Sequence, residues 1–375
     1  MRIPLAKPEI TEEDIKSVEE VLRTSYLSLG PKLIEFENII KEYTGIKYVV
    51  TVNSGTSALH LIIKSLNIKD GDEVITTSFS FIASSNCILF ERAKPVFVDI
   101  EEESYTINPD LIEEKINEKT KAILAVDVFG QPAYWDKLEK IEKKYNLFLI
   151  EDSAEAIGSK YKEKICGTFG DAGIYSFYPN KQITTGEGGA ILTNNENIYN
   201  LSKSYRNQGR GEGSFWLEHI RIGYNYRLPD LNCALGISQL KRIDKIIEKR
   251  KKIFNIYKFY LRDIEEIILP QEREDSTVNW FNYVVRLKDN FTKIQRDALI
   301  QFLNENGVES KNYFPPIHLQ PFYINLFNYK TGDLPITEKI SDRTISIPFF
   351  NELTEKEIIY IKGKIKEGLL YIKSL

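Results

Sequence analysis

Short apolar runs alternate with stretches of helical periodicity over the first half of the chain, and this alternation limits the fold more than any other feature. Apolar runs of strand length occupy residues 48–52, 73–77, 95–99, 122–127, 147–152, 172–177 and 189–192. Amphipathic stretches separate several of them, such as the run containing Ala58, Leu59, Ile62, Ile63 and Leu66. Strands that alternate with helices are typical of one mostly parallel sheet with helices on both faces. We therefore predict an α/β fold.

The second half of the chain predicts a smaller structural unit. A long, mostly helical stretch runs from residue 231 to about residue 262, and a strand at 280–287, a helix at 296–306 and a C-terminal helix from 354 follow it. We predict a large α/β domain over residues 1–240, and a connector helix with a small α+β domain over residues 241–375. Asn108-Pro109 also predicts the start of a helix, because proline is favoured at the first helical position.

Composition excludes several classes of function. The formal net charge of −4 provides no overall basic field, so neither nucleic acid nor an anionic membrane is expected as a partner. Three widely spaced cysteines fit neither a disulfide framework nor a zinc site, and they are typical of a cytoplasmic protein. No signal-peptide core or bilayer-spanning apolar run is found, and we expect no metal and no membrane association.

Lys181 closes the polar turn that follows the predicted strand at 172–177, and a glycine cluster at 186–189 comes soon after it. The ends of strands are where α/β proteins place their chemistry. A lysine in a partly apolar pocket can lose its proton and form a Schiff base with an aldehyde cofactor. A solvated surface lysine is the alternative interpretation.

Two further motifs lie at strand ends. Residues 54–57, Ser-Gly-Thr-Ser, form a strand-to-helix turn whose free N–H groups favour an anion, although an ordinary helix cap explains the same residues. Asp152 ends a fully apolar strand, where a carboxylate needs a cationic or hydrogen-bonding partner. A protonated pyridine nitrogen is such a partner, and capping of a following helix is the alternative.

The motifs taken together carry a family resemblance. Ser-Gly-Thr-Ser-Ala-Leu at 54–59, Glu-Asp-Ser-Ala-Glu-Ala at 151–156, Ser-Phe-x-x-x-Lys at 176–181 with Gly-Glu-Gly-Gly at 186–189, and Asn-Tyr-Arg at 225–227 occur in this order. The chain resembles, over nearly its whole length, the nucleotide-sugar aminotransferases of the DegT family. These enzymes use pyridoxal 5'-phosphate and have the aspartate-aminotransferase fold, fold type I.

The resemblance implies a role for each matching residue. Lys181 corresponds to the Schiff-base lysine that moves the proton, and Asp152 to the partner of the pyridine nitrogen. Asn225 corresponds to an asparagine that reaches the cofactor of a neighbouring subunit, which implies a homodimer with composite sites. Other positions match residues that bind the cofactor: Ser54, Gly55, Thr56 and Ser176 at its phosphate, and Phe81 and Ala154 on its two faces.

Glu155 distinguishes branches within the family. Many members carry Gln or His at this position, whereas Glu resembles the perosamine-synthase-like branch. Next to the cofactor's phenolic oxygen this carboxylate would be protonated or turned toward the substrate, and a solvated helix residue is the alternative. A related branch of sugar dehydratases has histidine at the lysine position, so Lys181 argues against that branch.

Three more residues are candidates for substrate binding. Tyr313 and His318 lie in the segment 312–321, which resembles the family segment that approaches the sugar and diphosphate. A structural role for His318 is the alternative. Arg227 is a candidate for binding the diphosphate, in its own site or in a partner's, and a structural ion pair with Asp230 is the alternative.

The function that these expectations favour is transfer of the amino group of L-glutamate to the 4-keto carbon of a nucleotide-linked 4-keto-6-deoxyhexose, for glycan or surface-polysaccharide synthesis. The pyridoxamine form of the cofactor would carry the amino group between the two half-reactions. A 3-keto-sugar or keto-inositol aminotransferase and a catalytically silent regulatory relative are the alternatives. A dinucleotide-binding dehydrogenase is disfavoured, because no Gly-x-Gly-x-x-Gly follows the first strand. The nucleotide (GDP, UDP or dTDP) stays open.

Overall fold

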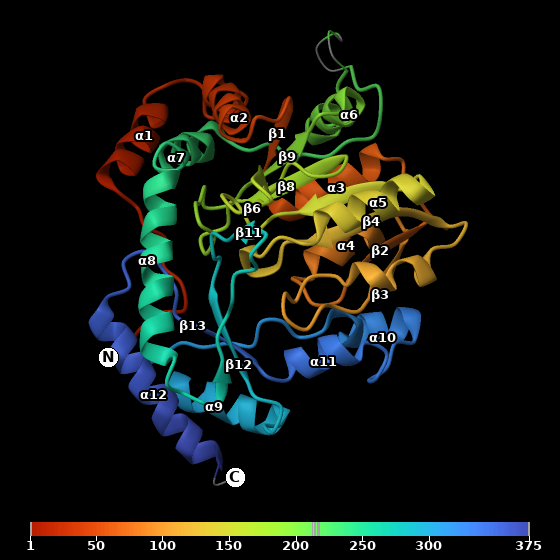
Figure 1. Ribbon diagram of the computed structural model, residues 1–375. Helices are drawn as coiled ribbons and strands as arrows, with labels where there is room; N and C mark the ends of the chain where they lie inside the picture. Colours follow the sequence, from red (N-terminus) through yellow and green to blue (C-terminus); the bar gives the residue numbers. More distant parts are fainter. Residues whose placement is uncertain (1, 212, 214, 216–217, 374–375) are drawn as a thin grey trace.

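A seven-stranded sheet forms the centre of the larger part of the molecule (Figure 1). The computed structural model describes residues 2–211, 213, 215 and 218–373. In spatial order the strands are β1 (Tyr48–Val52), β9 (Gly189–Thr193), β8 (Ala172–Ser176), β5 (Phe148–Asp152), β4 (Thr120–Val126), β2 (Glu73–Thr77) and β3 (Lys94–Val98). Only β9 runs antiparallel to its two neighbours, and all other pairs from β8 to β3 are parallel. The prediction of a mostly parallel sheet is confirmed.

Helices cover both faces of this sheet. Alternate residues of each strand point to opposite faces, and nearly all of them are buried because both faces are covered. One face packs against α3 (Gly55–Ser65), α4 (Ala83–Phe90) and α6 (Glu196–Arg206). The other packs against α2 (Pro31–Thr44) and α7 (Asp230–Leu240) near β1, and against α5 (Trp135–Tyr145) near β4. Helix α1 (Glu12–Leu22), which lies against α7, begins with a capping box formed by Thr11 and Asp14.

A smaller unit has its own core. Helix α8 (Ile243–Leu261) leads into it, and Lys241 and Arg242 separate α8 from α7, so the predicted connector is two helices. Strands β10 (Ile267–Ile268), β12 (Tyr283–Leu287) and β13 (Thr344–Ile347) form its sheet, against α9 (Lys293–Glu305) and α12 (Glu355–Lys373). Ile3 lies in this same core and pairs with Val308, so the segment before α1 packs with the smaller unit. The domain limits of 1–240 and 241–375 stay a prediction.

Short elements complete the described chain. Strands β6 (Lys160–Tyr161), β7 (Lys164–Ile165) and β11 (Ser276–Thr277) form a small sheet, and α10 (Pro321–Phe327) and α11 (Pro335–Ser341) precede β13. Single helical turns are η1 (Pro109–Leu111), η2 (Glu113–Lys115), η3 (Val128–Gly130) and η4 (Ile317–Leu319). The helix start predicted at Asn108-Pro109 is confirmed, since Asn108 caps a helical turn that begins with Pro109, but this turn is a 3-10 helix and ends after three residues. The next turn stops where Ile116 adopts an extended backbone.

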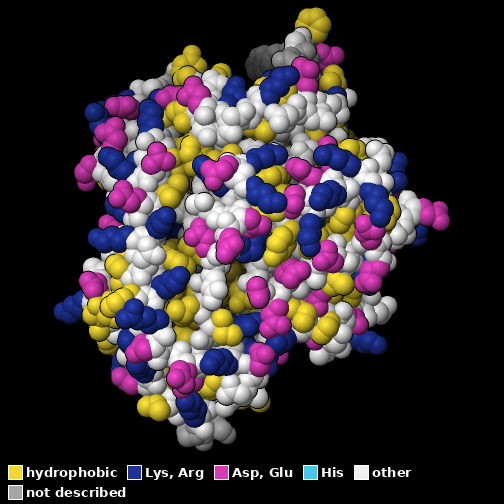
Figure 2. All heavy atoms as spheres, viewed as in Figure 1, with side chains coloured by type: hydrophobic (Ala, Val, Ile, Leu, Met, Phe, Trp, Pro, Cys, Tyr) yellow, Lys and Arg dark blue, Asp and Glu magenta, His cyan; other side chains and the backbone are white. Residues whose placement is uncertain are grey.

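The visible surface carries both charges. Lysine and arginine side chains are interspersed with aspartate and glutamate over the face shown in Figure 2, and neither sign forms a continuous field there. Among the described residues no helix is both long enough and apolar enough to cross a membrane.

Candidate active site

The carboxyl ends of β4, β5 and β8 meet the N-terminus of α3 around a cavity of about 430 Å³. Residues from distant parts of the chain reach it because parallel strands end at the same edge of the sheet. The predicted site residues that line this cavity are Ser54, Gly55, Thr56, Phe81, Asp152, Ala154, Glu155, Ser176, Lys181 and Tyr313. We call it the catalytic cavity.

Lys181 extends into the catalytic cavity from the turn after β8. Its Nζ lies 3.3 Å from Glu155 Oε1 and 4.1 Å from the centre of the Phe281 ring. Only 12% of the side chain is exposed. A surface lysine would be solvated, so this alternative is wrong. The amine is held between one carboxyl group and one aromatic face.

Asp152 is the last residue of β5 and is almost completely buried. Its Oδ2 accepts a hydrogen bond from the Ser84 hydroxyl at 2.7 Å, and its Oδ1 accepts one from the Ala154 N–H at 3.1 Å. Burial raises the pKa of Asp152, while these two bonds and the charge of Lys181 act in the opposite direction. The chain after Asp152 forms turns rather than a helix, so the capping alternative is wrong.

The N-terminus of α3 forms the opposite end of the cavity. Ser54 caps the helix by accepting a hydrogen bond from the Ser57 N–H at 3.1 Å. A Cβ on Gly55 would lie 2.9 Å from Ser176 Cβ, so only glycine lets the helix approach β8 this closely. Helix capping and an anion site are compatible here, because the N–H groups of the first turn still point out of the helix end.

Glu155 is buried rather than solvated, which corrects the surface alternative. Its Oε2 accepts a hydrogen bond from the Phe129 N–H at 2.9 Å, and its Oε1 faces Lys181. Burial raises the pKa of Glu155, and the nearby Lys181 charge opposes this shift. The carboxyl group therefore joins the lysine to the loop that follows β4.

Aromatic residues form the outer walls of the catalytic cavity. Phe81 is 60% exposed at the cavity, whereas Tyr313 is partly buried, and this burial raises the pKa of Tyr313 to about 12. Phe314 stacks on Phe129, with ring centres 5.4 Å apart.

Sequence reasoning missed Ser84 and Phe281, and the only signal for Ser84 was the run of small hydroxyl residues around Phe81.

Asn225 and Arg227 lie outside the lining of the catalytic cavity in their own chain. Asn225 is exposed and pairs through its backbone with Asn207. Arg227 donates to the side-chain oxygen of Asn207 at 3.0 Å. The suggested ion pair of Arg227 with Asp230 is wrong, because the buried Asp230 instead accepts hydrogen bonds from the Gly30 and Lys32 N–H groups before and within the first turn of α2.

His318 also lies away from the catalytic cavity. Its side chain is fully buried in η4, with Nδ1 2.7 Å from the Ser78 hydroxyl and Nε2 3.1 Å from Glu338 Oε1. Burial lowers the pKa of His318. This geometry favours the structural role that was the alternative to substrate binding.

Two buried acidic residues, Asp127 and Glu151, lie next to the end of β5. Asp127 and Glu151 both contact the Ser153 hydroxyl, at 2.5 and 2.8 Å. Burial and the neighbouring Asp127 raise the pKa of Glu151 well above its usual value. Backbone N–H groups of Ala133 and Phe169 donate to the two carboxyl groups. The pair is thus fully hydrogen-bonded and holds Asp152 in place through the backbone.

The residues of the catalytic cavity fit pyridoxal phosphate. The cavity provides a carboxylate at one end, a helix N-terminus with a glycine at the other, and a partly buried lysine between the walls. Asn180 also presents a buried side-chain oxygen that has no hydrogen-bond partner in the described part of the chain. A cofactor with a cationic ring nitrogen, an aldehyde and a phosphate satisfies this set of groups.

Comparisons with known proteins find relatives that match almost the whole chain. The family model described as the DegT/DnrJ/EryC1/StrS aminotransferase family matches residues 8–366. GDP-perosamine synthase of Escherichia coli O157:H7 is 36% identical over 367 residues, which cover 97% of this chain and 98% of that protein. Among solved structures, Helicobacter pylori PseC, an aminotransferase involved in the biosynthesis of pseudoaminic acid, superposes with a TM-score of 0.94, 30% identity and full coverage of both chains. The PLP form of the sugar aminotransferase Spr1654 from Streptococcus pneumoniae superposes with a TM-score of 0.94 at 28% identity, covering 99% of this chain and 100% of that one.

Proposed function

This chain belongs to the DegT/DnrJ/EryC1/StrS aminotransferase family, and from that premise we propose that it transfers the amino group of L-glutamate to a nucleotide-linked keto sugar. As a member of the family it is a pyridoxal-phosphate-dependent sugar aminotransferase. The observation that carries the proposal is the placement of Lys181, Asp152 and Glu155 in one cavity with the N-terminus of α3. A catalytically silent relative would not need a buried lysine beside a buried carboxylate.

Different residues of the catalytic cavity would bind different parts of the cofactor. Asp152 stabilises positive charge at the ring nitrogen, and the N-terminus of α3 with Ser176 binds the phosphate. Bound pyridoxal phosphate supplies an aldehyde that accepts amines and a ring that stores the electron pair of a broken C–H bond. Lys181 takes the proton from the carbon of the donor and returns one to the carbon of the acceptor. Its distance of 3.3 Å to Glu155 keeps the amine oriented between these transfers.

The acceptor proposed is a 4-keto-6-deoxyhexose linked to a nucleotide. Glu155 supports this choice because it matches the perosamine-synthase-like branch, and the chain is similar to a GDP-perosamine synthase over almost its full length. Tyr313 lines the catalytic cavity, which supports the proposal that it contacts the sugar. A 3-keto sugar or a keto-inositol on the same scaffold is the alternative, and the nucleotide would be decided by groups outside the catalytic cavity.

We also propose a homodimer whose sites combine two chains. Asn225 is exposed and does not reach the catalytic cavity of its own chain, which supports a role in a neighbouring one. The exposed aromatic residues Phe81 and Tyr178 line the same cavity and would be covered by a partner. Mixing Lys181→Ala and Asn225→Ala subunits tests this proposal. Hybrid dimers should regain activity in one of their two sites, and a mixture as inactive as its components would contradict it.

The amino transfer itself is tested by an absorbance spectrum before and after L-glutamate is added. Bound pyridoxal phosphate should give a visible band that glutamate shifts to the near ultraviolet. Lys181→Ala should abolish the shift at normal turnover times, while Lys252→Ala, an exposed lysine on α8, should leave it unchanged. GDP-, UDP- and dTDP-linked 4-keto-6-deoxyhexoses are then tested for return of the visible band. No band with added cofactor, or no response to glutamate, would refute the proposal at its first step.

A further inference from the structure

A second cavity of about 610 Å³ lies between the two units of the molecule. Its walls come from the loops after β3 and β4, from the segment after β10, and from one face of β12 and the residues before it. Trp280, Asn282, Val284 and Arg286 alternate along this last segment and therefore share one face. No described residue lines both this cavity and the catalytic one. We call it the interdomain cavity.

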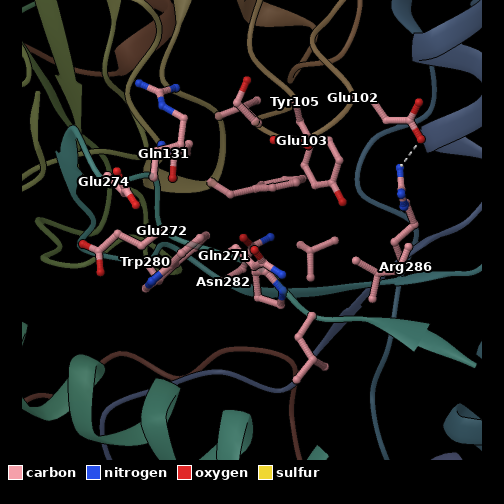
Figure 3. A pocket seen from close by; sticks show the side chains of 18 residues that line it. Glu102, Glu103, Tyr105, Gln131, Gln271, Glu272, Glu274, Trp280, Asn282 and Arg286 are labelled. Carbon is pink, nitrogen blue, oxygen red and sulfur yellow. Dashed lines mark hydrogen bonds and ion pairs between the residues drawn. The ribbon is translucent and has the colours of Figure 1, made fainter. Parts of the chain in front are cut away.

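Four side chains of the interdomain cavity have buried polar atoms without a hydrogen-bond partner in the described part of the chain: Gln131 Oε1, Arg273 Nη2, Asn282 Oδ1 and Arg286 Nε. Gln131, Asn282 and Arg286 are only 3%, 7% and 8% exposed. Figure 3 shows them on the walls around the cavity, with Gln131 opposite Arg286 and Asn282 between them. Leaving such groups unpaired is costly, so a ligand that pairs with them would be stabilised.

The other ends of these side chains are already fixed. The amide nitrogen of Gln131 donates to the Ser276 hydroxyl at 3.1 Å, and that of Asn282 donates to the Ser346 hydroxyl at 3.4 Å. Arg286 Nη1 donates to Glu102 Oε1 at 3.2 Å, the contact drawn as a dashed line in Figure 3. The free atoms are therefore held in position before any ligand arrives. Two acceptors and two donors match the hydroxyl groups of a polyol, each of which can both donate and accept.

The charge of the interdomain cavity disfavours an anion. Four glutamates line it, Glu102, Glu103, Glu272 and Glu274, against two arginines. Each arginine already pairs with one carboxylate, Arg273 with Asp275 at 3.0 Å and Arg286 with Glu102 at 3.2 Å. A phosphate or carboxylate would therefore meet an excess of negative charge. A neutral ligand, or one that carries an amine, would not.

Aromatic rings complete the lining. The aromatic residues Tyr105, Phe129 and Trp280 line the same cavity. Ligand sites commonly combine such residues with a few fixed polar groups that set orientation. A sugar ring has this double character, with C–H groups on its faces and hydroxyl groups at its edge. We propose that the interdomain cavity binds a sugar or amino sugar without acidic groups, at a site separate from the catalytic one and independent of the function proposed above.

The proposal is tested by calorimetry and ligand-observed NMR on the protein saturated with pyridoxal phosphate. The probes are D-glucose, D-glucosamine and D-glucose 6-phosphate, each up to about 10 mM, where a Kd near 1 mM gives clear saturation. One of the first two should bind with one site per chain, and the phosphate should bind at least about tenfold more weakly because of the glutamates. Excess L-glutamate should not displace the sugar, because it acts in the other cavity.

Substitutions in the interdomain cavity test whether the sugar binds there. Asn282→Ala should weaken it about tenfold, the loss expected when one buried hydrogen bond is removed. Gln131→Ala should do the same, and it replaces Asn282→Ala if that protein fails to fold. Asn197→Ala, an exposed asparagine on α6, is the matched control and should change nothing. Absence of binding by both non-acidic sugars, tighter binding of the phosphate, or binding that neither cavity variant weakens would overturn the proposal.

Discussion

Removal of the Ser84 hydroxyl should weaken cofactor binding through Asp152. The Ser84 hydroxyl is 2.7 Å from Asp152 Oδ2, which is shorter than its 3.2 Å distance to the Phe81 carbonyl. It is also the largest influence that opposes the raised pKa of Asp152. In Ser84→Ala the pKa of Asp152 should therefore rise further, and less of the carboxylate should be ionised to pair with the cofactor nitrogen.

The size of this effect follows from the kind of bond that is lost. A hydrogen bond to a charged group contributes about 1.5–3 kcal/mol. If the whole contribution is expressed in binding, the Kd for pyridoxal phosphate should rise about ten- to hundredfold. The deficit should be largest at low pH and should shrink as pH rises, because Asp152 then ionises again without help from Ser84.

Equilibrium titration of the apo protein with pyridoxal phosphate, followed by absorbance between about pH 6 and pH 9, measures this effect. Ser85→Ala is the matched control, since Ser85 is also buried on α4 but its hydroxyl donates to the Ile82 carbonyl at 3.3 Å. Thermal unfolding of both variants shows whether stability changes equally. Equal Kd values for the two variants, or a deficit in Ser84→Ala that grows with pH, would refute the reasoning.

Three further substitutions test other parts of the structure. Burial raises the pKa of Glu151 in the folded protein above its usual value of 4.5. The folded state therefore holds this proton more tightly than the unfolded state, and the stability gained in this way is complete below pH 4.5 and is lost as the pH rises through the folded-state pKa. Glu151→Gln cannot lose a proton, so its Tm should fall less than that of the wild type between about pH 5 and pH 8, and a steeper fall would contradict the raised pKa. Asp230→Ala should lower the free energy of unfolding by about 2–5 kcal/mol, measured with denaturant, because the Gly30 and Lys32 N–H groups lose a buried partner. A decrease below about 0.5 kcal/mol would show that water replaces the carboxylate. His318→Ala should lower stability by about 2–4 kcal/mol with an unchanged KM for the sugar substrate, and a raised KM at unchanged stability would restore the substrate-binding role.

The strands of the main sheet and the two central site residues could be predicted from the sequence. Each strand is a short apolar run bounded by polar residues, and Lys181 and Asp152 stand where such runs end. Because parallel strands end at one edge, the sequence positions alone imply that the two side chains approach each other. The antiparallel direction of β9 was not predictable, since an apolar run carries no information about strand direction.

Contacts that depend on packing were also beyond sequence reasoning. Ser84 and Asp152 are separated by 68 residues, and no local pattern links a helix hydroxyl to a strand carboxylate. The alternative partner suggested for Arg227 was wrong for a similar reason: Asp230 is near in sequence, but it bonds to N–H groups at the start of α2, and Arg227 bonds to Asn207. The interdomain cavity likewise needs the relative placement of two units, which periodicity does not provide.

The pairing of residues near Ile3 with the smaller unit has a consequence for the order in which the chain is made. Leu5 N–H lies 3.2 Å from a Glu309 carboxylate oxygen, across 304 residues of sequence, and the Leu5 carbonyl accepts a hydrogen bond from the Phe349 N–H. During synthesis the seven strands of the main sheet, which end at Thr193, are complete well before these partners leave the ribosome. Residues 3–5 therefore leave the ribosome long before the residues with which they pair. The core of the smaller unit can form completely only after residues 308–349 have been synthesised.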